Sequence, residues 1–162
     1  MKFIVRYIAY IICVMASLIS TAHAQSPYAW EYRPVYIFAP TERAAELSEQ
    51  IDLFMQHRTQ MLERHMALIA VTDKAEVIFG PDQPYTSAEL RRAYNITPTE
   101  FTVILVGKDT GVKRRHVGVI DPDLIFIQID GMPMRRQEMR LKSIDRINDP
   151  LKKCETLHDL RC

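Results

Sequence analysis

The chain lacks the sequence signatures of several large enzyme classes. It contains no C-x-x-C pair, which thiol redox catalysis normally requires. It also contains no G-x-S-x-G, no H-E-x-x-H and no glycine-rich phosphate loop. Its few histidines are scattered along the sequence. We therefore expect no catalytic residues, no metal and no cofactor.

The first 24 residues have the layout of a secretory signal peptide. Lys2 and Arg6 precede an apolar stretch, Tyr7–Ile19, and the small-residue sequence Ala22-His23-Ala24 follows it. The apolar stretch is short for a bilayer core of about 30 Å. We expect cleavage before Gln25 and a periplasmic or secreted product with no later membrane span. An uncleaved membrane anchor is the alternative.

Three cysteines occur, and two of them lie at the end of the chain. In an oxidising compartment Cys154 and Cys162 are first interpreted as a disulfide. A continuous helix would separate their Cα atoms by about 12 Å, whereas a disulfide needs less than about 7 Å. The segment is therefore either bridged and non-helical, or helical and unbridged. A metal site that also uses His158 is a further alternative.

Apolar patterns predict strands that alternate with helices. Thr41 can cap the first helix, Thr86 and Glu89 form a capping box for the second, and Asp121 caps the last clear one. Pro133 is expected to block continuation of that helix, with only a turn or two more after it. The predicted strands are Pro34–Ala39, Met66–Val71, Phe101–Val106 and Val112–Val117, with a short extra strand at Val77–Phe79. The predicted helices run from about Thr41 to Arg64, from Thr86 to Tyr94 and from Asp121 to Gly131.

This order predicts an α/β fold with a mixed sheet and helices on both faces. Strand–helix–strand units imply parallel pairing in the first half, and the hairpin at Asp109-Thr110-Gly111 adds an antiparallel edge. We expect a signal peptide at 1–24, one domain at 25–142 and an appended tail at 143–162.

Three segments resemble an uncharacterised thioredoxin-like family, catalogued as a domain of unknown function. The family that it resembles includes small exported bacterial proteins and vertebrate sushi-repeat matrix proteins. The resemblance implies no agreed activity. In thioredoxin-like folds a proline before the third strand is commonly cis, and Pro98 is the matching position. The segments that carry the resemblance are Arg33–Pro40, Phe101–Asp109 and Asp130–Arg140.

The resemblance also implies a groove where the first helix begins beside the proline loop. The candidate binding residues there are Thr41, Glu42, Arg43, Pro98 and Thr99. Because no cysteine lies in Ala39–Ala44, we expect a redox-inactive scaffold that binds a protein or peptide weakly at this groove.

A basic run at residues 113–116 is the competing surface. In a strand Lys113 and Arg115 share one face, where they could bind an anionic polymer or protect an edge strand from aggregation. Nucleic acid is not expected outside the cytoplasm. The other functional alternatives are an enzyme that uses the groove, and an envelope metal or stress factor with Met or Cys/His ligands.

Overall fold

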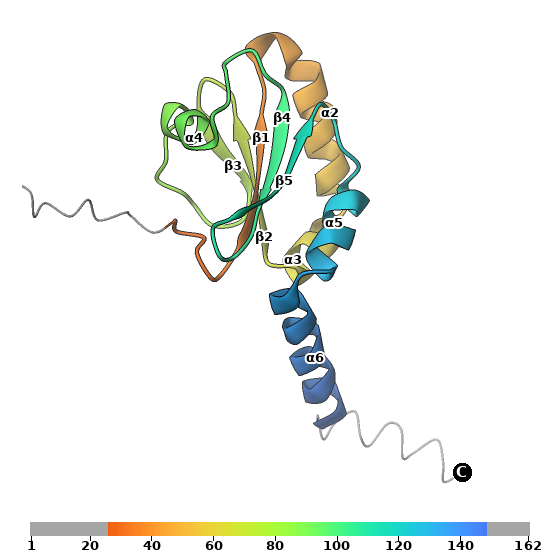
Figure 1. The fold of residues 1–162 in the computed structure, drawn as a ribbon. Helices are drawn as coiled ribbons and strands as arrows, with labels where there is room; N and C mark the ends of the chain where they lie inside the picture. The colour runs from red at the N-terminus through yellow and green to blue at the C-terminus, as the bar shows by residue number, and fades with distance from the viewer. Residues whose placement is uncertain (1–25, 149–162) are drawn as a thin grey trace, which may run out of the picture.

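The computed structural model describes residues 26–148, and the element labels follow Figure 1. The predicted signal peptide and both tail cysteines lie outside these residues. The strands are β1 (Arg33–Phe38), β2 (Met66–Val71), β3 (Ala75–Phe79), β4 (Thr102–Val106) and β5 (Val112–Val117). The helices are η1 (Thr41–Arg43), α2 (Ala44–Met55), α3 (Arg58–Glu63), α4 (Ser87–Tyr94), α5 (Pro122–Asp130) and α6 (Pro133–Asn148).

The strands form one mixed sheet in the order β3-β2-β1-β4-β5. The β1–β2 pair is parallel, as predicted, and the other three pairs are antiparallel. The second strand–helix–strand unit was also expected to give a parallel pair, but β4 runs antiparallel to β1. The reason is that β3 reverses the chain after β2. The order and directions are consistent with a thioredoxin-like arrangement, which confirms the α/β fold class.

Helices cover both faces of the sheet (Figure 1). Helices α2, α3 and α5 pack on one face, where Val35, Leu68 and Val103 are fully buried. Helix α4 lies on the other face, over Tyr36 and Ile104. Burial of alternate residues on opposite faces follows from the two-residue period of a strand.

Local signals account well for α4 and α5. Thr86 and Glu89 form the capping box, and Asn95 ends α4 in the left-handed conformation at φ 53°. Asp121 caps α5 through the Asp123 backbone N–H. Both helices therefore begin and end where the sequence predicts.

The long helix predicted from Thr41 to Arg64 is divided. A short 3-10 turn opens it, and the chain leaves helical geometry again at His57, with φ −109° and ψ 29°. The break allows Phe54 of α2 and Met61 of α3 to reach the same core.

Pro133 begins a helix rather than blocking one. Proline is tolerated at the first helical position, where its missing N–H has no intrahelical partner. Helix α6 then continues past Lys142 to Asn148 and extends away from one end of the sheet (Figure 1). No helix within residues 26–148 combines the length and apolar character needed to cross a membrane.

Candidate functional site

The structure brings the two predicted groove segments together at one end of the sheet. Arg91 on α4 joins them, because its guanidinium donates to the carbonyl oxygens of Ala39 at 3.0 Å and Thr97 at 2.9 Å. Thr41, Glu42, Pro98 and Thr99 are exposed there, whereas Arg43 is only partly exposed. The structure thus joins the two segments through Arg91, and the binding role of these five residues stays a prediction.

The polar groups at this edge are bound to one another. Arg43 forms an ion pair with Glu46 and its guanidinium lies 4.8 Å from the centroid of the Phe101 ring. The Thr41 hydroxyl lies 3.3 Å from an oxygen of Asp73. The prediction of a cis bond at Pro98 is wrong, since residues 26–148 contain only trans peptide bonds. The mixed sheet is consistent with a thioredoxin-like arrangement, but the bond before Pro98 is not the cis bond that this resemblance predicted.

Strand β5 presents its basic side chains alternately, as predicted. Lys113 pairs with Asp109 at 2.6 Å, and Arg115 donates to the Tyr94 carbonyl oxygen at 2.6 Å. Arg114 points to the other face and donates to the side chain of Gln128. Lys113 and Arg115 therefore already bind groups of this chain, which leaves less of their charge for an anionic polymer.

A hollow of about 540 Å³ lies between the start of the described chain, α4 and the β4–β5 turn. We call it the aromatic hollow, and it was not predicted from the sequence. Four aromatic side chains line it, together with the carboxylates of Glu89 and Asp109, and none of its lining residues is basic. The aromatic residues are Trp30, Tyr36, Tyr85 and Tyr94.

Two of the tyrosines form a fixed wall. The rings of Tyr36 and Tyr94 have centroids 5.2 Å apart, and their hydroxyl groups share a hydrogen bond. Burial raises the pKa of both hydroxyls, so they remain neutral at physiological pH. Tyr36 is only 1% exposed, so the partly exposed Tyr94 supplies most of the accessible ring surface of this wall.

Trp30 is the most unusual residue of the aromatic hollow. Its side chain is 63% exposed, and its backbone has φ 67°. A positive φ is uncommon for a bulky residue and costs on the order of 1 kcal/mol. The backbone N–H of Trp30 donates to the Lys108 carbonyl oxygen at 2.7 Å, which holds this conformation. Thr110, also in the lining, has φ 63°.

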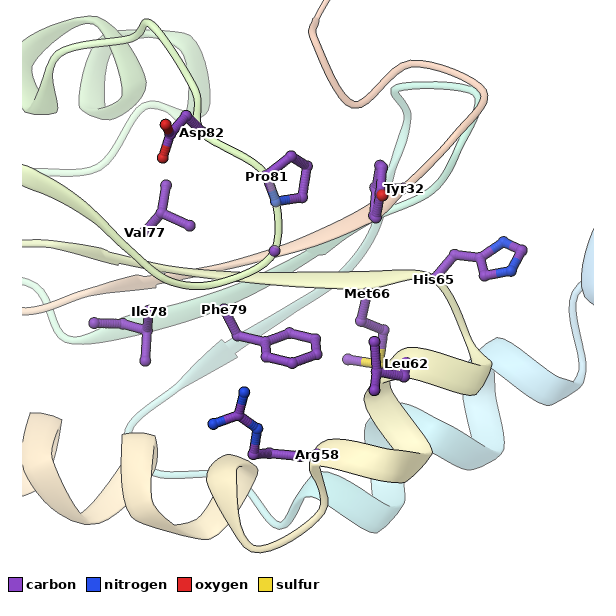
Figure 2. A pocket seen from close by; sticks show the side chains of 11 residues that line it. Tyr32, Arg58, Leu62, His65, Met66, Val77, Ile78, Phe79, Pro81 and Asp82 are labelled. Carbon is purple, nitrogen blue, oxygen red and sulfur yellow. The ribbon is translucent and has the colours of Figure 1, made fainter.

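A second hollow, of about 470 Å³, lies where β3 meets α3, and we call it the β3 hollow (Figure 2). Figure 2 shows Arg58 beneath Phe79, and its guanidinium carbon lies 5.4 Å from the ring centroid. Leu62, 63% exposed, is also in the lining. The Arg58 cation thus already covers the Phe79 ring, one of the two aromatic side chains in this lining, the other being Tyr32.

Charged side chains meet at the end of the sheet where α6 begins, and we call them the charged cluster. Glu138 on α6 accepts from Arg33 at 3.0 Å and from Lys108 at 2.8 Å. Arg33 is only 1% exposed and Lys108 is 7% exposed. Burial opposes ionisation of Glu138, but the hydrogen bonds from both cations outweigh it and lower its pKa to about 2.

Further ion pairs surround this centre. Arg135 binds Asp130 at 3.2 Å and donates to the Glu63 carbonyl oxygen at 2.6 Å. His65 contacts the Lys108 ammonium through Nδ1 at 2.8 Å. Partial desolvation and the Lys108 charge lower the pKa of His65, so its ring is neutral at pH 7. The cluster ties α6 to the sheet.

The three central residues of the charged cluster, Arg33, Lys108 and Glu138, come from the same three segments that carry the family resemblance. A family model described as "Domain of unknown function (DUF4174)" matches residues 26–138. This match includes Arg33, Lys108 and Glu138. The chain belongs to the DUF4174 family.

Curated relatives of this DUF4174 domain are larger proteins. The chain is 26% identical over 131 residues to "Sushi repeat-containing protein SRPX" of Rattus norvegicus and of Homo sapiens. The protein of that name from Mus musculus is 25% identical. These alignments cover 77% of the chain but 28% of each relative. No solved structure matches the chain significantly.

Neither the charged cluster nor the aromatic hollow was predicted from the sequence. A usable signal existed for the charged cluster, because each of the three family segments contributes at least one charged residue to it. The aromatic hollow left no such signal in the DUF4174 sequence, since its rings come from four separate places. Within the described residues, no group of three or more metal-ligating side chains comes together.

Proposed function

We propose that this DUF4174 domain is an exported, non-catalytic binding module and that the aromatic hollow is its binding site. The single observation that carries the proposal is the exposed, positive-φ Trp30 beside the Tyr36–Tyr94 wall. Backbone strain of this kind concentrates at functional sites. An exposed tryptophan next to a tyrosine-lined hollow supplies apolar contact area and hydrogen-bonding hydroxyls for a ligand.

The two surfaces favoured by the sequence are weaker candidates. At the groove, Arg43 is bound to Glu46 and stacked on Phe101. On β5, Lys113 and Arg115 are bound to groups of this chain. A ligand at either surface would have to replace these contacts, whereas binding at the aromatic hollow leaves them in place.

Export is part of this proposal and rests on the signal-peptide layout of residues 1–24. A redox-inactive scaffold is expected because no cysteine lies between residues 14 and 153. The disulfide between Cys154 and Cys162 stays a prediction.

The test uses the fact that Trp30 is the one tryptophan of the chain. Its emission should change in a saturable way when a ligand enters the aromatic hollow. A panel of small organic ions, oligosaccharides and short peptides is screened by this emission, and hits are measured by calorimetry. We expect Trp30→Ala to abolish binding of each hit.

Leu62→Ala is the matched control, because Leu62 is also 63% exposed but lines the β3 hollow. It should leave binding unchanged. Binding that survives Trp30→Ala and is lost in Leu62→Ala would overturn the assignment. Chemical turnover of a panel compound would refute the non-catalytic function.

A further inference from the structure

The chemistry of the aromatic hollow indicates the class of its ligand. Its lining combines aromatic rings with the carboxylates of Glu89 and Asp109 and contains no lysine, arginine or histidine. Aromatic faces carry negative electrostatic potential and attract cations. Such a lining disfavours anions and favours a positively charged guest.

Arginines elsewhere in this chain show that its aromatic rings do attract cations. Arg43, Arg58, Arg64 and Arg91 each place a guanidinium carbon 4.8 to 5.7 Å from the centroid of a phenylalanine ring. In the β3 hollow the chain itself supplies this cation, namely Arg58. In the aromatic hollow the lining supplies none.

The carboxylates are only partly available for direct ion pairing. Asp109 is bound to Lys113 at 2.6 Å, and Glu89 accepts from the backbone N–H of Thr86 at 2.8 Å. A primary ammonium is strongly hydrated and needs acceptors for its N–H groups when it leaves water. The hollow therefore suits a cation that has no N–H donors.

We propose that the aromatic hollow binds a quaternary ammonium group of the choline type, with Trp30 as the exposed aromatic platform. This inference rests on the proposed function and names its ligand class. The methylated cation contacts Trp30 and the accessible part of Tyr94, with the buried Tyr36 behind it. Glu89 supplies long-range attraction without losing its role in the helix cap. We propose that a small soluble molecule carries this quaternary ammonium group. A lipid headgroup is the other possible source of the same group.

The experiment titrates the mature protein with choline and with 3,3-dimethyl-1-butanol, its neutral isostere, and follows Trp30 emission and calorimetry. We expect saturable choline binding and isostere binding that is at least about fivefold weaker, because only the cation gains the ring attraction. Ethanolamine, a primary ammonium, should also bind at least about fivefold more weakly than choline.

A matched pair of variants isolates the charge. Glu89→Gln keeps a capping-box side chain, since glutamine also serves at that position. It should weaken choline binding about two- to fivefold and leave the isostere unaffected. Glu49→Gln is the control, because Glu49 is an exposed carboxylate that lines a different hollow on α2. It should change the binding of neither choline nor the isostere.

The outcomes separate the two proposals. If the isostere binds as tightly as choline, the aromatic hollow is a binding site but recognition of a cation is refuted. If Trp30 emission responds to neither compound nor to any member of the screening panel, the proposed function fails as well. Sedimentation with phosphatidylcholine vesicles, but no binding of free choline, would overturn the soluble ligand in favour of the lipid headgroup.

Discussion

Replacing Glu138 with glutamine tests how the charged cluster holds α6. The variant keeps the shape of the side chain but removes the charge that faces Arg33 and Lys108. Arg33 is 1% exposed, so its guanidinium would remain buried without a counter-charge. Breaking a fully buried ion pair costs about 3–5 kcal/mol. Glu138 is 22% exposed, which places the expected loss near the lower end, at about 3 kcal/mol.

Urea unfolding followed by circular dichroism measures this loss as a change in the free energy of unfolding. The matched control is Glu63→Gln, because Glu63 pairs with Lys142 at 3.6 Å while both side chains are about half exposed. An exposed pair contributes less than about 1 kcal/mol, so this variant should stay near wild type. A Glu138→Gln loss no larger than that of the control would refute the argument that the cluster stabilises the fold.

The difference in unfolding free energy between wild type and Glu138→Gln depends on pH. The pKa of Glu138 is about 2 in the folded state against an ordinary value of 4.5, so the folded state binds this proton more weakly. Its stabilisation is present above pH 4.5 and is lost as the pH falls toward 2. The stability difference between wild type and Glu138→Gln should therefore shrink below pH 4.5. The lowered pKa of His65 destabilises both proteins below about pH 6.5, and because the Glu138 charge raises that pKa, Glu138→Gln lowers it further. The stability difference should therefore widen slightly between about pH 6.5 and 4.5 before it shrinks.

Three other substitutions test single elements by the same unfolding assay. Gln50→Leu should cost about 2–4 kcal/mol, because the fully buried amide satisfies both backbone groups of Ile120, at 2.6 and 2.9 Å. Thr86→Ala should cost about 1 kcal/mol through loss of the cap of α4. Arg91→Lys should cost about 1–2 kcal/mol, because an ammonium cannot reproduce the guanidinium fork that donates to three carbonyl oxygens.

Thr99→Ala is the shared control for these substitutions, since Thr99 is exposed and caps no helix. It should change the unfolding free energy by less than about 0.5 kcal/mol. A variant among the three that stays within that range would contradict the contact assigned to it.

The elements that the sequence predicted correctly are those with local causes. Thr86 and Glu89 mark the start of α4 by their spacing alone, and Asp121-Pro122 does the same for α5. The break in the predicted long helix at His57 has no such local cause, because it depends on where Met61 packs in the core. Pro133 was misjudged because a proline opens a helix as readily as it ends one.

The candidate site was harder to predict than the fold. Hydrophobic periodicity placed Tyr36 in a strand and Tyr94 in a helix, but not against each other. The positive φ of Trp30 depends on a hydrogen bond to Lys108, which lies 78 positions away in the sequence. Contacts between such distant segments leave no period or spacing that a single sequence can reveal.

A map of backbone amide chemical shifts during a choline chloride titration tests the central claim most directly. Binding at the aromatic hollow predicts shifts that saturate and cluster at Trp30, at residues 89–94 and at Thr110. Shifts that cluster instead at residues 40–43 and 97–100, or on β5, would place binding on one of the surfaces favoured by the sequence. That result, or a titration that leaves the Trp30 and Thr110 amides unmoved, would contradict the account.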